Sequence, residues 1–142
     1  MSNTRPNRRP LAAALAVSLF ALAAGALAAD VKVTLGGDQE VPAVTTQAKG
    51  SGTITVGDDK SVSGSVTTSG IAGNAAHIHM AAAGQNGGVI IPLTKNGDNG
   101  WTVPAGAKLT DPQYDAFKKG DLYVNVHTPA HPGGEIRGQL KP

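Results

Sequence analysis

Two of the chain's four histidines stand two residues apart in the apolar stretch "AAHIHM", residues 75–80. Side chains alternate between faces along a β-strand, so His77 and His79 would point the same way, with Ile78 on the opposite face. Their imidazoles would then lie about 7 Å apart, near enough to bind one ion together. Met80 would face away from both histidines and is predicted to lie in the core.

The other two histidines lie close together near the C-terminus. His127 stands near the end of the alternating segment "LYVNVHT", and His131 follows in the turn "HTPAHPGG". If segments 74–80 and 121–127 pair or face each other, three or four imidazoles converge. The chain has no cysteine, so its metal ligands would be nitrogen, oxygen or thioether, which suits Cu(II), Zn(II) or Ni(II). We predict a copper site at His77, His79 and His127, with His131 as a further candidate ligand and zinc as the less favoured ion.

Two other interpretations of these residues stay open. A same-face histidine pair is often only polar surface or a hydrogen-bonded structural pair. Glu135 and Arg137 share a face of the last predicted strand and could form a structural ion pair. Alternatively, Arg137 could lie near the histidines and attract an anion. Nucleophilic and phosphate-binding sites are not indicated, since no G-x-S-x-G motif occurs and no helix follows the glycines at 84–88.

The elements that must position these residues have a hydrophobic period of two. Short segments rich in Val, Thr and Ile are separated by turn residues, which is typical of an antiparallel β-sandwich or barrel. We expect strands at 31–35, 52–56, 62–68, 88–93, 122–128 and 134–140.

One short helix is expected near residues 111–119. Thr110 or Asp111 can cap it, Pro112 suits its first turn, and Gly120 suits the position after its end. Tyr114 and Phe117 are three residues apart and can pack together on one face.

Residues 1–28 have the features of a secretory signal. A basic start with Arg5, Arg8 and Arg9 precedes an apolar run and the small-residue pattern "ALA" at 26–28. The paired arginines in "NRRPLA" also weakly resemble a twin-arginine export signal. We therefore expect residues 29–142 to form a single domain in the periplasm or outside the cell, with no membrane attachment after cleavage.

The charge of the chain changes when the signal is removed. Nine Lys and Arg then remain against ten Asp and Glu, a net charge near −1. No basic patch is left that would favour nucleic acid as a partner.

These segments also resemble a known domain family. "AAHIHM…GQNGGVIIPL" followed by "GDLYVNVHTPAHPGGEIRGQL", together with "QEVPAVTTQAKGSGTITV", resembles the CHRD domain over residues 31–140. This domain is named from chordin and is widespread in bacterial exported proteins. The resemblance implies an all-β fold but no single activity, since many members have none assigned.

A weaker resemblance is to copper-zinc superoxide dismutases. A strand with H-x-H, a glycine-rich loop and a late arginine are similar to the arrangement in that family, which implies a Greek-key-like fold. It further implies copper at His77, His79 and His127 and steering of superoxide by Arg137. The disulfide cysteines and a recognisable zinc loop are missing, so only a copper-only site could be carried over.

Three functions therefore compete, and the sequence leaves open whether the protein is an enzyme. The favoured one is a copper-binding protein that buffers the ion or delivers it to a periplasmic partner. The second is a copper-only superoxide dismutase with Arg137 near the ion. The third is a protein or glycan interaction module in which the histidines are structural. The metal's identity and the oligomeric state are not fixed by the sequence.

Overall fold

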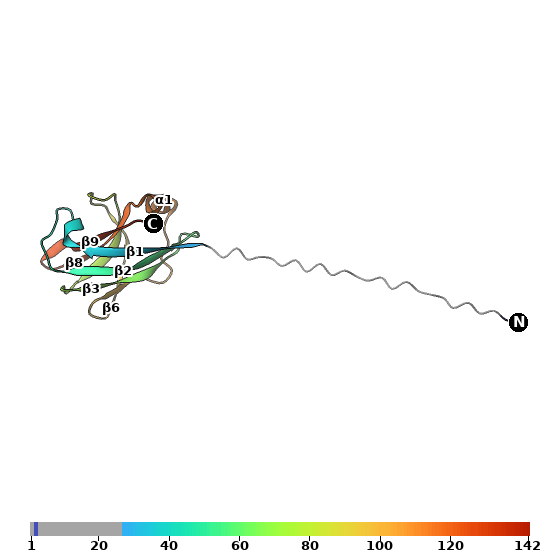
Figure 1. Cartoon of the computed structure of the whole chain (residues 1–142), viewed down its shortest axis with the longest axis horizontal. Coiled ribbons are helices and arrows are strands. Elements are labelled where there is room, and N and C mark those ends of the chain that lie inside the picture. The colour runs from blue at the N-terminus through green and yellow to red at the C-terminus, as the bar shows by residue number, and fades with distance from the viewer. Residues whose placement is uncertain (1, 3–26) are drawn as a thin grey trace.

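The computed structural model describes Ser2 and residues 27–142 (Figure 1), so nearly all of the predicted signal segment 1–28 lies outside the described residues. The described residues form nine strands, a short 3-10 helix and one α-helix. In chain order these are β1 (Ala28–Gly36), η1 (Gly37–Gln39), β2 (Lys49–Gly57), β3 (Val62–Ser69), β4 (Ala75–Met80), β5 (Val89–Pro92), β6 (Thr94–Asn96), β7 (Gly100–Thr102), α1 (Asp111–Lys119), β8 (Leu122–Thr128) and β9 (His131–Leu140).

All the strand pairs are antiparallel and form one sheet in the order β5-β4-β8-β9-β1-β2-β3-β7-β6. Where β1 meets β9, only Gly36 and Arg137 are paired, so the sheet divides there into two halves. The outermost strands β5 and β6 are separated in the chain by Leu93 alone, whose N–H donates to the Ala76 carbonyl at 2.9 Å. The result is a nearly closed, barrel-like sheet, and the predicted all-β antiparallel fold is confirmed.

Alternation along the strands separates an apolar interior from a polar face. In β8 the side chains of Leu122, Val124 and Val126 belong to the hydrophobic core, as do Ala76 and Ile78 of β4. The residues between them point to the other face of the sheet, which is where the histidines lie. The core is completed by both halves of the sheet, with Leu35, Ile54, Val66, Ile136 and Leu140 at most 1 % exposed.

The helix forms where its end signals predict it. Thr110 and Gln113 exchange side-chain and backbone hydrogen bonds in a capping box, and Gly120 takes the left-handed conformation with φ 80°. Tyr114 and Phe117 stack with ring centroids 6.3 Å apart, and Phe117 is buried. Both predictions about this helix are confirmed.

Two sequence expectations differ from the structure. Met80 is 40 % exposed rather than in the core, because it is the last residue of β4. Strands β6 and β7 were not predicted, since each has only three residues. The six predicted strands all correspond to observed ones.

Candidate metal centre

The pairing of β4 with β8 brings three histidines together. In this antiparallel register Ala75 lies opposite His127, while His77 and His79 lie opposite Asn125 and Tyr123. All three histidines therefore share the outer face of two neighbouring strands. The condition that the sequence left open, that segments 74–80 and 121–127 be neighbours, is fulfilled.

The three imidazoles are close enough to act as one group. One ring nitrogen from each of His77, His79 and His127 lies within 4.8 Å of the other two. Nδ1 of His77 and Nε2 of His127 are 2.9 Å apart, and the ring centroids of the three pairs are separated by 4.8–6.0 Å. We call these three residues the histidine cluster, and it could hold a metal ion.

Backbone carbonyls set the protonation of two of these rings. Nδ1 of His79 lies 3.0 Å from the Gly87 carbonyl oxygen, and Nδ1 of His127 lies 2.9 Å from that of Pro132. A carbonyl can only accept, so both Nδ1 atoms must carry the hydrogen. Nε2 of each ring is then left with its lone pair, which is the form that binds a metal. Contacts of this kind commonly orient metal-binding histidines.

Burial favours the neutral form of two histidines of the cluster, His77 and His79. His79 is 7 % exposed, and its Nε2 has no hydrogen-bond partner among the described residues. Burial lowers the pKa of His79, and it also lowers that of His77, which the neighbouring imidazoles of His127 and His79 lower further. Neutral imidazole is the metal-binding form, so these environments favour it.

His131 lies outside the histidine cluster. It begins β9, and its Nε2 is 3.9 Å from a carboxylate oxygen of Glu135. Glu135 in turn accepts hydrogen bonds from Thr128 and Thr46. The contacts of His131 are thus with Thr128 and Glu135. A role of His131 as fourth metal ligand stays a prediction.

Arg137 lies on the same outer face but is turned towards a loop. Its side chain is only 1 % exposed. Its guanidinium donates to the carbonyl oxygens of Gln85 at 2.8 Å and Ala82 at 3.2 Å, and to the side-chain oxygen of Gln139 at 3.2 Å. These contacts support a structural role, and anion steering by Arg137 stays a prediction.

Sequence reasoning missed the residues that surround the cluster. Tyr123 stacks on His79 with ring centroids 4.7 Å apart and an angle of 2° between the planes. Asn125 and Glu40 are both buried close to this face. Tyr123 and Asn125 stand at positions i−4 and i−2 from His127, so strand alternation could have placed them on its face. Glu40 comes from an irregular segment, and no pattern in the sequence indicates its position.

Comparison with known protein families settles the family. The CHRD domain model matches residues 31–140, which is most of the chain. The chain belongs to the CHRD domain family. No curated protein and no solved structure gave a match to this CHRD chain. Within its described residues, no helix is both long enough and apolar enough to cross a membrane.

Proposed function

We propose that this CHRD protein is exported to the periplasm or the cell exterior and binds one copper ion through His77, His79 and His127, in copper buffering or delivery. One observation carries the proposal: a nitrogen from each of the three imidazoles lies within 4.8 Å of the others. With no cysteine in the chain, a site of imidazoles suits copper or zinc, and copper(II) binds such sites more tightly. The signal-like features of residues 1–28 support export.

Nδ1 of His77 and Nε2 of His127 are 2.9 Å apart and form a hydrogen bond, in which His77 donates because Nε2 of His127 carries the lone pair. An ion bound by both nitrogens would take the place of this hydrogen. Copper is placed before zinc because copper(II) binds imidazole sites more tightly.

The surroundings of the cluster support binding rather than superoxide dismutation. Steering of an anion needs a positive group that solvent and the anion can reach. Arg137 is 1 % exposed and its donors are engaged by loop carbonyls. We therefore place copper buffering or delivery first and keep copper-only superoxide dismutation as the alternative activity of the same site.

The first test is a titration of the purified protein with Cu(II), followed by electron paramagnetic resonance. The wild type should bind one equivalent with nitrogen hyperfine structure from several imidazoles. The double variant His77→Ala/His79→Ala should lose this signal and the tight binding. His131→Ala tests the predicted fourth ligand separately. His131 lies outside the histidine cluster, so a site of three imidazoles should keep both in this variant, and loss of either would make His131 a ligand.

The same samples separate the alternatives. Dismutation of superoxide by the copper-loaded protein, absent from the double variant, would favour the enzyme. Weak copper binding that is equal in the wild type and the double variant would refute the copper proposal. In that case the histidines would be structural, and protein or glycan partners would be sought next.

A further inference from the structure

A loop covers the part of the outer face that holds His79. Residues 81–88, which we call the covering loop, connect β4 to β5. The loop supplies the Gly87 carbonyl that accepts from His79 Nδ1 at 3.0 Å. The position of this loop therefore fixes which nitrogen of His79 carries the hydrogen and which is free to bind a metal.

Arg137 on β9 holds the covering loop in place. Its guanidinium donates to the Gln85 and Ala82 carbonyl oxygens at 2.8 and 3.2 Å and lies 3.5 Å from the side-chain oxygen of Asn86. Arg137 forms no salt bridge within the part of the chain that the structure describes. A buried cation of this kind depends on its hydrogen bonds, because losing them would leave the charge uncompensated in a poorly solvated place. If the covering loop moved away from Arg137, these hydrogen bonds would be lost, at a cost in free energy.

Tyr123 connects Arg137 to His79. Strands β4 and β9 flank β8 on opposite sides, so the Tyr123 ring lies between the two side chains. The guanidinium carbon of Arg137 is 3.5 Å from the centre of the Tyr123 ring, and the parallel ring of His79 is 4.7 Å away. The Tyr123 hydroxyl oxygen also accepts from the Gly87 N–H at 3.1 Å. The N–H and the carbonyl of Gly87 are thus held by two neighbouring side chains, Tyr123 and His79.

The backbone of Gly87 comes too close to β4 to carry a side chain. A Cβ atom at this position would overlap the carbonyl oxygen of Met80. Glycine is therefore needed for the loop to bring its carbonyl within hydrogen-bonding distance of His79 Nδ1.

We propose that Arg137 and Tyr123 are positioning residues that hold the covering loop so that His79 keeps its hydrogen on Nδ1 and presents Nε2 as a metal ligand. The proposal rests on the proposed copper function, which it deepens by naming what prepares one ligand. Arg137 and Tyr123 do not touch the metal in this arrangement. They act through Gly87 and through the stacked ring.

The test begins with the metal-free protein, using nitrogen NMR of the imidazoles and hydrogen exchange of the Gly87 amide. In the wild type His79 should be in the form with hydrogen on Nδ1, and the Gly87 amide should exchange slowly. Arg137→Gln should produce a mixture of the two forms and speed exchange at Gly87 at least tenfold. Tyr123→Phe keeps the ring stack but loses the hydroxyl, so it should speed exchange with a smaller effect on the imidazole.

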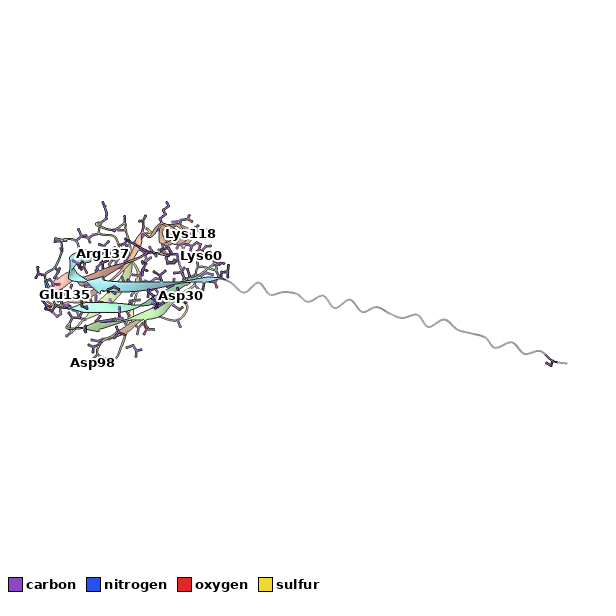
Figure 2. All side chains as sticks on the ribbon, in the orientation of Figure 1. Asp30, Lys60, Asp98, Lys118, Glu135 and Arg137 are labelled. Atoms are coloured by element: carbon purple, nitrogen blue, oxygen red, sulfur yellow. The ribbon has the colours of Figure 1, made fainter. Side chains whose placement is uncertain are left out.

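Copper affinity is measured next on the same variants. Removing groups that orient a metal ligand typically weakens binding about 10–100-fold, and we expect Arg137→Gln to lie in that range. Lys118→Gln is the matched control, since it also removes one positive charge but lies on α1, where Lys118 pairs with Asp115 at 2.8 Å; Figure 2 labels both Lys118 and Arg137. It should match the wild type in all three measurements.

The outcomes separate this proposal from the copper function. Hydrogen on Nε2 of His79 in the wild type would overturn the positioning role, as would Gly87 exchange and imidazole signals that neither variant changes. If Arg137→Gln does not fold, Tyr123→Phe still decides the matter through Gly87 exchange. A wild type with the expected imidazole form but no copper binding would instead refute the copper function and leave the loop contacts confirmed.

Discussion

At the scale of single residues, the histidine cluster combines positions that the sequence predicts with contacts that it does not. The H-x-H pattern places His77 and His79 on one face, because strand geometry alone decides this. The carbonyl acceptor of Gly87 lies in an irregular segment, and that of Pro132 lies at the start of β9, before residue 134 where the sequence predicts the last strand to begin. The pattern of the sequence indicates neither acceptor, so it predicted the three histidines but not their protonated nitrogens.

Glu40 is a further buried titratable residue near this face. Its side chain is 6 % exposed, and Oε1 has no hydrogen-bond partner among the described residues. Burial raises the pKa of Glu40 from its ordinary value of 4.5 to about 7, although the charge of Arg137 and a contact with Asn125 act to lower it. The folded protein therefore binds the Glu40 proton more tightly than the unfolded chain does.

This shift predicts how stability depends on pH. A raised folded-state pKa contributes stability that is complete below about pH 4.5 and is lost as pH rises through about 7. Glu40→Gln removes that dependence, so the wild type should lose about 1–2 kcal/mol relative to the variant between pH 5 and pH 8, allowing for screening by water. Urea unfolding at both pH values measures this difference. The lowered pKa values of His77 and His79 act in the opposite direction but are common to both proteins. A difference that stays constant with pH would contradict the prediction.

At the scale of elements, the hydrophobic period of the strands and the residues that end the helix explain which elements the sequence could predict. The six predicted segments correspond to strands, one of them, 88–93, from a short apolar run, and the helix 111–119 was predicted from its cap, proline and terminal glycine. Strands β6 and β7 were not predicted, because three residues are too few to display a hydrophobic period. Trp101 of β7 is buried in the core, with Val66 of β3 and Lys95 of β6 paired on either side of it.

The cap of α1 gives a test of the local argument. Thr110 accepts a hydrogen bond from the Gln113 N–H, so Thr110→Ala should lower the free energy of unfolding by about 1 kcal/mol. Thr110→Ser keeps the hydroxyl and serves as the control, with a much smaller loss. Denaturant unfolding of the three proteins measures both values. Equal losses in the two variants would show that the hydroxyl does not act as a cap.

At the scale of the whole molecule, the two halves of the sheet bring distant segments onto one face. His77 on β4 and His127 on β8 are 50 residues apart in sequence, and β9 adds Arg137 to the same face. The strand order that places these residues on one face could not be predicted from the sequence, since an alternating segment does not specify which strands will pair with it. The site could be predicted only on the condition that these strands pair.

Metal binding should stabilise the entire fold if the cluster binds copper. A ligand that binds only the folded state adds about 2.7 kcal/mol at a free concentration of 100 times its Kd. For a domain of this size the thermal midpoint should rise by roughly 10 °C. Thermal unfolding with and without Cu(II) measures the rise, which His77→Ala/His79→Ala should abolish and His131→Ala should retain. An equal rise in the double variant would place the copper elsewhere.

The near closure of the sheet has a further consequence for how copies of this protein behave together. A free strand edge is where one sheet can be extended by another chain, and such extension leads to fibrils. The two outermost strands here have only four and three residues, and they carry Pro92 and Lys95. Neither offers a long run of free backbone groups. The short β5 and β6 therefore disfavour strand-to-strand pairing through these two edges when copies of the domain are crowded.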